Sequence, residues 1–177
     1  MGPFRNLGFS AYFYRAVNAT AAGTTAINGT SIDLLGAFGG PFDCCCYIAA
    51  CGALTASQNT VLKVQSAPDN STWNDVQGSH QGPPNDTQGN GLLIVDGYRW
   101  GQRYIRPVVA RGTANAVIDA VIGIAYNAHS LPITTQDTTV ATLQSGGTGM
   151  ASQGFYGTST TATFPVNVVA YGVQGTA

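Results

Sequence analysis

The chain has 177 residues, a formal net charge of −1, and charged side chains at only 8% of its positions. This length suits one domain, and the lack of an apolar run of about 18 residues argues against a helix that spans a membrane. Seven cations scattered among eight aspartates exclude a basic surface that follows the phosphates of a nucleic acid. Because a free monomer usually carries more surface charge, part of this surface is expected to lie against other subunits.

Residues 1–16 carry a dense group of aromatic side chains: Phe4, Phe9, Tyr12, Phe13 and Tyr14. Two interpretations stay open. The segment is an arm that docks on a neighbouring subunit, because aromatic side chains supply large contact areas at low entropic cost. Alternatively, it is the first strand of the chain's own sandwich. In both cases residues 1–20 precede a domain predicted over residues 21–130.

The segment from residue 24 to 35 alternates apolar and polar side chains around Asn28-Gly29. This dipeptide is the strongest short hairpin signal in the chain. The sequence therefore predicts a hairpin here, with Ile27, Ile32 and Leu34 pointing inward.

The next predicted strand, residues 42–54, contains all four cysteines. On a strand, Cys44 and Cys46 point to one side, and Cys45 and Cys51 point to the other. No Cys-x-x-Cys pair or nearby histidine completes a tetrahedral metal site. The cysteines are therefore interpreted as small buried hydrophobes in a reducing compartment, with disulfides of a secreted scaffold as the alternative. No metal and no cofactor are expected.

Further runs rich in β-branched residues cover residues 60–66, 92–95, 103–110 and 116–124, separated by Gly, Pro, Asn and Asp. No helical stripe of apolar residues lies between them, so the spacing predicts an antiparallel β-sandwich. In the first run, Leu62 and Val64 share the face expected to lie on the core. In the last, the alternation places five residues on one face: Ala116, Ile118, Ala120, Ile122 and Ile124.

The run at residues 103–110 carries two arginines that are candidate interface residues, Arg103 and Arg106. The competing interpretation is that they are solvated side chains whose stems lie over Tyr104 or Trp100. Arg103 is expected on the face of Ile105, opposite Arg106. Pro107 has no amide hydrogen, so this strand is expected at a sheet edge or with a bulge.

Residues 131–177 are rich in Thr, Gly, Ser and Ala, and they have too little apolar surface to form a core alone. The segment ends in a run with strand character, residues 164–173. It is therefore interpreted as an extended C-terminal arm that adds to another subunit's sheet, with return to its own sandwich as the alternative. Its aromatic residues are further interface candidates: Phe155, Tyr156, Phe164 and Tyr171.

Groups that carry out chemistry are scarce. His80 and His129 are the only histidines and both lie in predicted loops, and Ser79 lacks the Gly-x-Ser-x-Gly context of a nucleophile. The glycine-rich tail lacks the Gly-Lys-Ser/Thr ending of a phosphate-binding loop. The sequence therefore predicts a protein that is not an enzyme.

The order of several motifs resembles two families. The segment from Val64 to Trp73, the Arg103-Tyr104-Ile105-Arg106 motif and the Val-Ile-Asp-Ala-Val-Ile run at residues 117–122 resemble discoidin-like carbohydrate- and lipid-binding modules. They are more similar to small phage virion proteins that decorate or cement capsids. The start of the chain has no secretory signal, and the free cysteines and low charge also suit assembly in a bacterial cytoplasm.

The resemblance to capsid decoration proteins implies that the predicted all-β antiparallel sandwich is a jelly roll. The N- and C-terminal arms are inferred from the residues of the two ends and not from the resemblance. The resemblance also implies a homotrimer that binds the major capsid protein on the surface of the virion and stabilises the shell. From the charge and the apolar runs of the sequence, no binding to nucleic acid or membrane is expected. The alternatives are a discoidin-like carbohydrate-binding module and a head or tail fibre or adaptor component of the virion.

Overall fold

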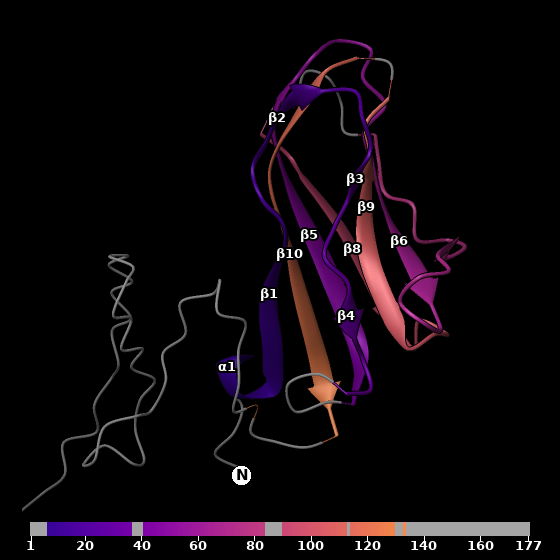
Figure 1. The fold of residues 1–177 in the computed structure, drawn as a ribbon. Coiled ribbons are helices and arrows are strands. Elements are labelled where there is room, and N and C mark those ends of the chain that lie inside the picture. The colour runs from indigo at the N-terminus through magenta and orange to yellow at the C-terminus, as the bar shows by residue number, and fades with distance from the viewer. Residues whose placement is uncertain (1–6, 37–40, 84–89, 113, 130–132, 134–177) are drawn as a thin grey trace, which may run out of the picture. The chain divides into compact units, whose positions relative to one another are not determined.

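The computed structural model describes residues 7–36, 41–83, 90–112, 114–129 and 133, and nearly all of its regular structure is strand. The strands form two antiparallel five-stranded sheets, which confirms the predicted all-β sandwich (Figure 1). The helix α1 (Leu7–Ser10) has four residues. None of the helices in the described ranges is long and apolar enough to cross a membrane.

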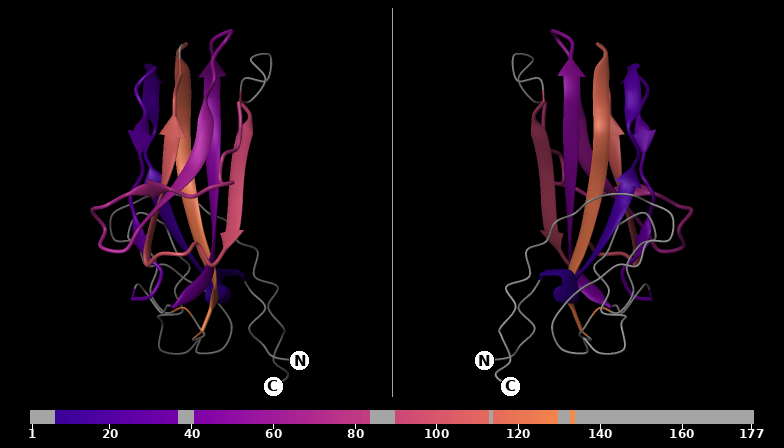
Figure 2. Two further views of the ribbon diagram at one scale, coloured as in Figure 1. Left: turned by 90° about the vertical axis from the view of Figure 1, so that its right-hand side faces the viewer. Right: turned by 90° about the vertical axis from the view of Figure 1, so that its left-hand side faces the viewer.

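Sheet A combines strands from both ends of the described chain: β1 (Ala11–Val17), β2 (Thr20–Gly23), β5 (Phe42–Leu54), β8 (Leu92–Tyr98) and β10 (Ala116–Ala128). Its order is β1-β10-β5-β8, and β2 also pairs with β10. The right-hand view of Figure 2 faces this sheet and shows β8, β5 and β10 side by side. Two of its strands, β5 and β10, have 13 residues each and form the centre of the sheet.

Sheet B contains shorter strands: β3 (Ile27–Asn28), β4 (Ile32–Asp33), β6 (Val61–Ala67), β7 (Asn74–Asp75) and β9 (Tyr104–Ala110). Its order is β3-β9-β6-β7, and β4 also pairs with β9. When β1 with β2 and β3 with β4 are each counted as one interrupted strand, each sheet has four strands. The chain passes between the two sheets several times, so each sheet receives strands from separate parts of the sequence.

The core lies between the sheets. Sheet A contributes Tyr14 and Tyr47, and sheet B contributes Leu62, Val64 and Ile105, each of which is at most 2% exposed. The inward position of Leu62 and Val64 follows the alternation predicted for this strand. Removing large apolar side chains from water is the main favourable term in folding, at roughly 1.5–3 kcal/mol for each.

The hairpin predicted at Asn28-Gly29 is wrong. The two short strands β3 and β4 do not pair with each other, because both pair with β9 and continue in the same direction along it. The amide of Gly29 donates to the carbonyl of Pro107 at 2.8 Å, and the amide of Thr30 donates to the carbonyl of Ala16 at 2.7 Å. The dipeptide therefore interrupts one strand and does not reverse the chain.

Pro107 does not mark a sheet edge, since β9 lies between β6 and the pair β3 and β4. Its partner on β6 is Val64, whose amide donates to Ser79 Oγ at 3.0 Å, on the side away from β9. The two residues thus form a non-hydrogen-bonded pair, and the backbone of Pro107 points toward β3 and β4. Its missing N–H faces the interruption between these strands, where no ladder hydrogen bond is lost.

Candidate assembly surface

The outer face of sheet A, turned away from sheet B, carries side chains from four strands. The register aligns them in rows that cross β1, β10, β5 and β8 in that order. The two central rows are Phe13, Ile124, Cys46 and Asp96, then Arg15, Ile122, Ile48 and Ile94. They are flanked by Tyr126, Cys44 and Tyr98 on one side and by Ala120, Ala50 and Leu92 on the other.

Large apolar side chains of this face remain in contact with solvent. Leu92 is 61% exposed, Tyr98 57%, Ile94 49% and Ile122 43%. An antiparallel sheet that faces water normally carries polar side chains on its outer side. A contiguous apolar surface of this kind marks an interaction site. We call this outer face, from Leu92 to Tyr98 and across to Ile122, the sheet A patch.

A bulge in β10 places two isoleucines on the sheet A patch. The pairing with β5 shifts between Ile118 and Ala120, and an extra residue in one strand reverses which side chains point inward beyond it. Ile118 is buried, whereas Ile122 is 43% exposed. The prediction that Ile118, Ile122 and Ile124 share one face is therefore wrong beyond residue 118. Val121 and Ala125 point into the core instead.

Two charged residues lie at opposite edges of the sheet A patch. Arg15 is on β1, is exposed, and makes no ion pair with another described residue. Asp96 is on β8 and accepts hydrogen bonds from the hydroxyl of Tyr126 at 2.9 and 2.8 Å. Partial burial raises the pKa of Tyr126, and the bond to Asp96 raises this pKa further. The two hydrogen bonds from Tyr126 fix the position of the Asp96 carboxylate at the edge of the patch.

The cysteines alternate across β5 as predicted. Cys45 and Cys51 point into the core at 0% and 1% exposure, while Cys44 and Cys46 belong to the outer face of sheet A. All four are free. Burial raises the pKa of the Cys46 thiol, and the negative charge of Asp96 adds to this effect. Within the described ranges, no group of three or more His, Cys or Asp residues is arranged to hold a metal ion.

The outer face of sheet B, in contrast, is polar, and its groups bond to one another. Lys63 Nζ lies 2.6 Å from Asp75 Oδ2, and Gln65 Nε2 donates to the same carboxylate at 2.8 Å. The Oε1 atom of Gln65 accepts two hydrogen bonds from Arg106, whose guanidinium lies 4.3 Å above the centre of the Trp73 ring. The bond from Lys63 lowers the pKa of Asp75. This face suits contact with water.

Arg103 lies in the turn before β9, so it does not share the buried face of Ile105 as predicted. Its guanidinium donates to both oxygens of Asp33, at 2.9 and 2.6 Å, and lies 5.0 Å from the centre of the Tyr104 ring. These bonds lower the pKa of Asp33. Arg103 was predicted either as an interface residue or as a solvated side chain lying over Tyr104 or Trp100. Its position over the Tyr104 ring agrees with the second interpretation.

The aromatic interface candidates near the N-terminus separate into two groups. Tyr12 and Tyr14 are each 2% exposed and lie in the core of this chain, so they do not form an exposed docking surface. Phe13, from the same strand, points outward to the sheet A patch. Phe9 belongs to α1, but its side chain is outside the described part. Phe4 lies outside the described residues. So do the four candidates of the C-terminal segment: Phe155, Tyr156, Phe164 and Tyr171.

Sequence reasoning missed the residues that dominate this surface. Leu92, Ile94 and Ile122 were assigned to strands but not to an interface. The run Leu92-Leu93-Ile94-Val95 offers a signal that could have found two of them, because four apolar residues in succession supply both faces of a strand. For Ile122 the signal is absent, since its outward position depends on the bulge.

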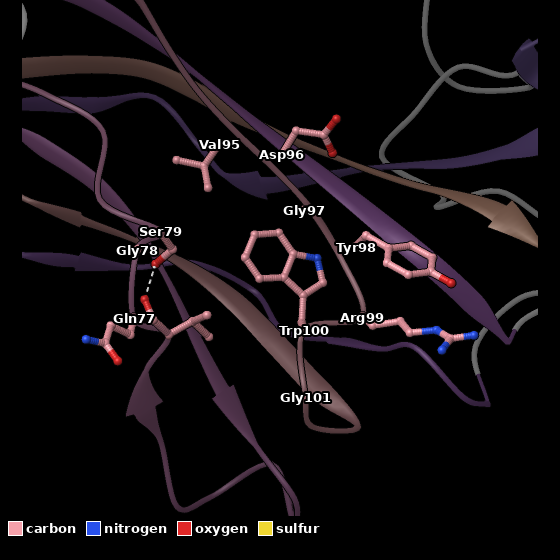
Figure 3. Close-up of a pocket in the computed structure, with 11 residues that line it drawn as sticks. Gln77, Gly78, Ser79, Val95, Asp96, Gly97, Tyr98, Arg99, Trp100 and Gly101 are labelled. Carbon is pink, nitrogen blue, oxygen red and sulfur yellow. Dashed lines mark hydrogen bonds between the residues drawn. The ribbon is translucent and has the colours of Figure 1, made fainter.

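A small hollow lies at one end of β8, where Trp100 packs against Gly97 (Figure 3). The indole nitrogen of Trp100 is buried and has no hydrogen-bond partner among the described residues. Ser79 also lines the hollow, but its hydroxyl donates to the carbonyl of Val76 at 2.7 Å and accepts from the amide of Val64 at 3.0 Å. These bonds give Ser79 a structural role in joining the loop to β6.

Comparison with known proteins finds a structural similarity. No protein family and no curated protein matches the sequence. The crystal structure of PBSX exported protein XepA is similar to this chain with a TM-score of 0.49 and 19% sequence identity. The similarity covers 79% of this chain and 44% of that one, so the chain spans less than half the length of that protein.

Proposed function

We propose that this protein is a non-catalytic structural component of a phage virion that binds the outside of the capsid and stabilises it. Its partners would be the major capsid protein and further copies of itself, and it would be assembled in the cytoplasm of the bacterial host. The observation that carries the proposal is the sheet A patch, an apolar surface on a chain in which only 8% of residues are charged.

The energy available from this surface supports such a role. Complete burial of a Leu or Ile side chain is worth roughly 1.5–3 kcal/mol. Leu92, Ile94 and Ile122 each keep about half of their surface exposed, so covering all three contributes several kcal/mol on the same scale, at roughly 25 cal/mol per Å² of apolar area. A contact of this strength is modest for one copy, but many copies on one shell add their contributions.

Cementing follows from mass action. A protein that binds the assembled shell, and not its separated subunits, stabilises the shell in proportion to the logarithm of its free concentration above the Kd. Each copy that touches two neighbouring capsid subunits also links them, so that both must separate together. No chemical step is needed, which agrees with the scarcity of histidines and other reactive groups in the sequence.

The proposal is tested on virus particles that carry the protein and on particles stripped of it. Stripped particles are expected to release their genome at a lower temperature, and the purified protein is expected to restore the original temperature. The variant Ile94→Asp should bind stripped particles at least tenfold more weakly. Asn74→Asp, which adds the same charge to an exposed position on sheet B, should bind normally. Unchanged heat resistance of stripped particles would reject a cement role.

The alternative functions give different results in the same preparations. A discoidin-like module would bind glycans as a purified monomer, and a fibre component would sediment as an elongated trimer. The resemblance to capsid decoration proteins implies a compact trimer, whereas the two-fold contact argued below implies a dimer, and sedimentation of the recombinant chain distinguishes the two.

A further inference from the structure

The two charges of the sheet A patch lie at its opposite edges and in neighbouring rows. Arg15 is in the row of Ile122 on the outermost strand β1, and Asp96 is in the row of Ile124 on the outermost strand β8. Neighbouring rows are two residues apart, which is about 7 Å along a strand. The patch therefore has a positive edge and a negative edge that are separated by apolar side chains.

These positions discriminate between two ways of placing a second copy on the patch. A two-fold axis that runs parallel to the strands, between β10 and β5, lays β1 of one copy over β8 of the other. Arg15 then comes within one row of the second copy's Asp96, twice in the interface. An axis that runs across the strands lays β1 over β1, which brings Arg15 near its own counterpart and Asp96 near its own. Like charges placed opposite each other in this way disfavour association.

We infer that the sheet A patch binds a second copy of this chain through an isologous contact whose two-fold axis runs parallel to the strands. Ile122 and Ile48 lie beside this axis, and Arg15 of each copy pairs with Asp96 of the other. The inference specifies the self-association included in the proposed function, but it does not depend on the capsid role.

The contact agrees with general features of sheet packing. Two sheets that pack face to face keep their strands within about 30° of each other and lie about 10 Å apart, which an axis parallel to the strands permits. The apolar centre supplies the affinity, since Ile122 and Ile94 are 43% and 49% exposed in the single chain. The paired charges at the rim fix the register, as charges at the edge of an interface commonly do. Tyr126 already holds the carboxylate of Asp96 in place through two hydrogen bonds.

The polar face of the molecule does not compete for this contact. On the outer face of sheet B, Lys63 pairs with Asp75, and Arg106 bonds to Gln65. These groups are already satisfied within the chain and would lose water on association. Arg15 of the sheet A patch makes no ion pair with a described residue. On association it gains one with Asp96 of the second copy.

The experiment is sedimentation equilibrium of the full chain over a range of concentrations. The unaltered protein is expected to show a concentration-dependent dimer, or an assembly built from dimers. Ile122→Asp should weaken the dimer at least tenfold, and Ile94→Asp is a second variant in case the first does not fold. Asn74→Asp, on sheet B, should leave the association constant unchanged. Melting followed by circular dichroism establishes that each variant is folded.

The charge pair is tested by exchange. Arg15→Asp and Asp96→Arg should each weaken the dimer about fivefold or more, and the doubly exchanged protein should recover most of the original affinity. A double variant that is as weak as the single ones would reject the pairing. A folded Ile122→Asp protein that associates like the original would reject the patch as the contact. Because the second copy and the capsid would use the same patch, the charge variants separate the two proposals. An Arg15→Asp protein that no longer dimerises but still stabilises stripped capsids would support the two-fold contact and show that the capsid role does not require it. An Arg15→Asp protein that still dimerises like the original would overturn the two-fold contact and leave the capsid role standing.

Discussion

The amide of Gly29 donates to the carbonyl of Pro107 at 2.8 Å, and a Cβ atom at Gly29 would lie only 2.6 Å from the Cγ of that proline. This close approach explains how a proline is accommodated in a central strand. The chain that follows β3 passes over the ring where the proline lacks its amide hydrogen, and it bonds to the one backbone group that Pro107 can offer. A residue with a side chain cannot come so near.

Gly29→Ala is therefore expected to destabilise the protein by about 1–3 kcal/mol, because the added methyl group forces the strand away from Pro107. The midpoint of urea unfolding measures the change. Thr30→Ala is the matched control, since this neighbouring side chain is exposed and its loss should change stability by less than about 0.5 kcal/mol. Equal midpoints for the two variants would contradict the close approach.

A second prediction concerns Tyr14 on β1 and Tyr47 on β5, which lie on either side of Gly123 of β10. The hydroxyl of Tyr14 donates to the hydroxyl of Tyr47 at 2.7 Å within the core. Tyr14→Phe removes this bond and should reduce the free energy of unfolding by about 1–2 kcal/mol. The double variant with Tyr47→Phe should cost less than the sum of the single changes, because it leaves no hydroxyl without a partner. Tyr98→Phe, at an exposed position, is the control and should be nearly neutral.

The same tyrosines predict how stability depends on alkaline pH. Burial is the main reason that the pKa values of Tyr14 and Tyr47 are raised well above 10.0, the usual value. The unfolded chain loses these protons near pH 10, while the folded chain retains them. Stability is therefore unaffected by these groups below pH 10 and falls as the pH rises further. Urea unfolding between pH 8 and about 11.5 should show this decline.

Ultraviolet absorbance offers an independent check of the alkaline prediction. Tyrosinate absorbs at longer wavelength than tyrosine, so the ionisation of Tyr14 and Tyr47 can be followed directly. The signals of Tyr14 and Tyr47 should appear only together with unfolding. Complete titration of all tyrosines in a protein that keeps its circular dichroism spectrum would show that the two rings are not buried as described.

The hollow at Trp100 gives a fourth prediction. A Cβ atom at Gly97 would lie 2.4 Å from Cζ2 of the Trp100 ring, so Gly97→Ala should push the indole toward solvent at a cost of about 1–3 kcal/mol. Its fluorescence should shift to longer wavelength. Trp73 is the other tryptophan of the chain, and the measurement is best made with Trp73→Phe present in both proteins. An unchanged emission maximum would contradict the packing of Trp100 on Gly97.

Several strands were predictable, because they are β-branched runs bounded by turn-forming residues. The predicted run at residues 60–66 overlaps β6 at all but its first residue, and the run at residues 116–124 falls within β10. Local patterns failed where the deciding contact lies far away in the sequence. The Asn28-Gly29 pair looks like a hairpin signal, but the glycine is required by Pro107. The position of that proline in a central strand depends in turn on the interruption between β3 and β4.

The sheet A patch was predictable only in part. Low charge indicated that some surface is covered, and the uninterrupted apolar run of β8 contains two residues of the patch. The rows in which Arg15 and Asp96 lie follow from the register between neighbouring strands, and the sequence of one strand does not reveal that register. The predicted aromatic candidates were chosen by residue type alone, and this criterion did not distinguish the buried Tyr12 from its outward-facing neighbour Phe13.

The bulge between Ile118 and Ala120 has a consequence for how such a molecule can change over generations. Loss of the codon for Asp119 would remove the extra residue, and simple alternation from the buried Ile118 would still place Val121 and Ala125 inward and Ile122 and Ile124 outward. In a regular strand the same deletion would turn every side chain beyond it to the other face. The apolar exterior of this molecule should therefore survive a one-codon deletion that would abolish it in an unbulged relative.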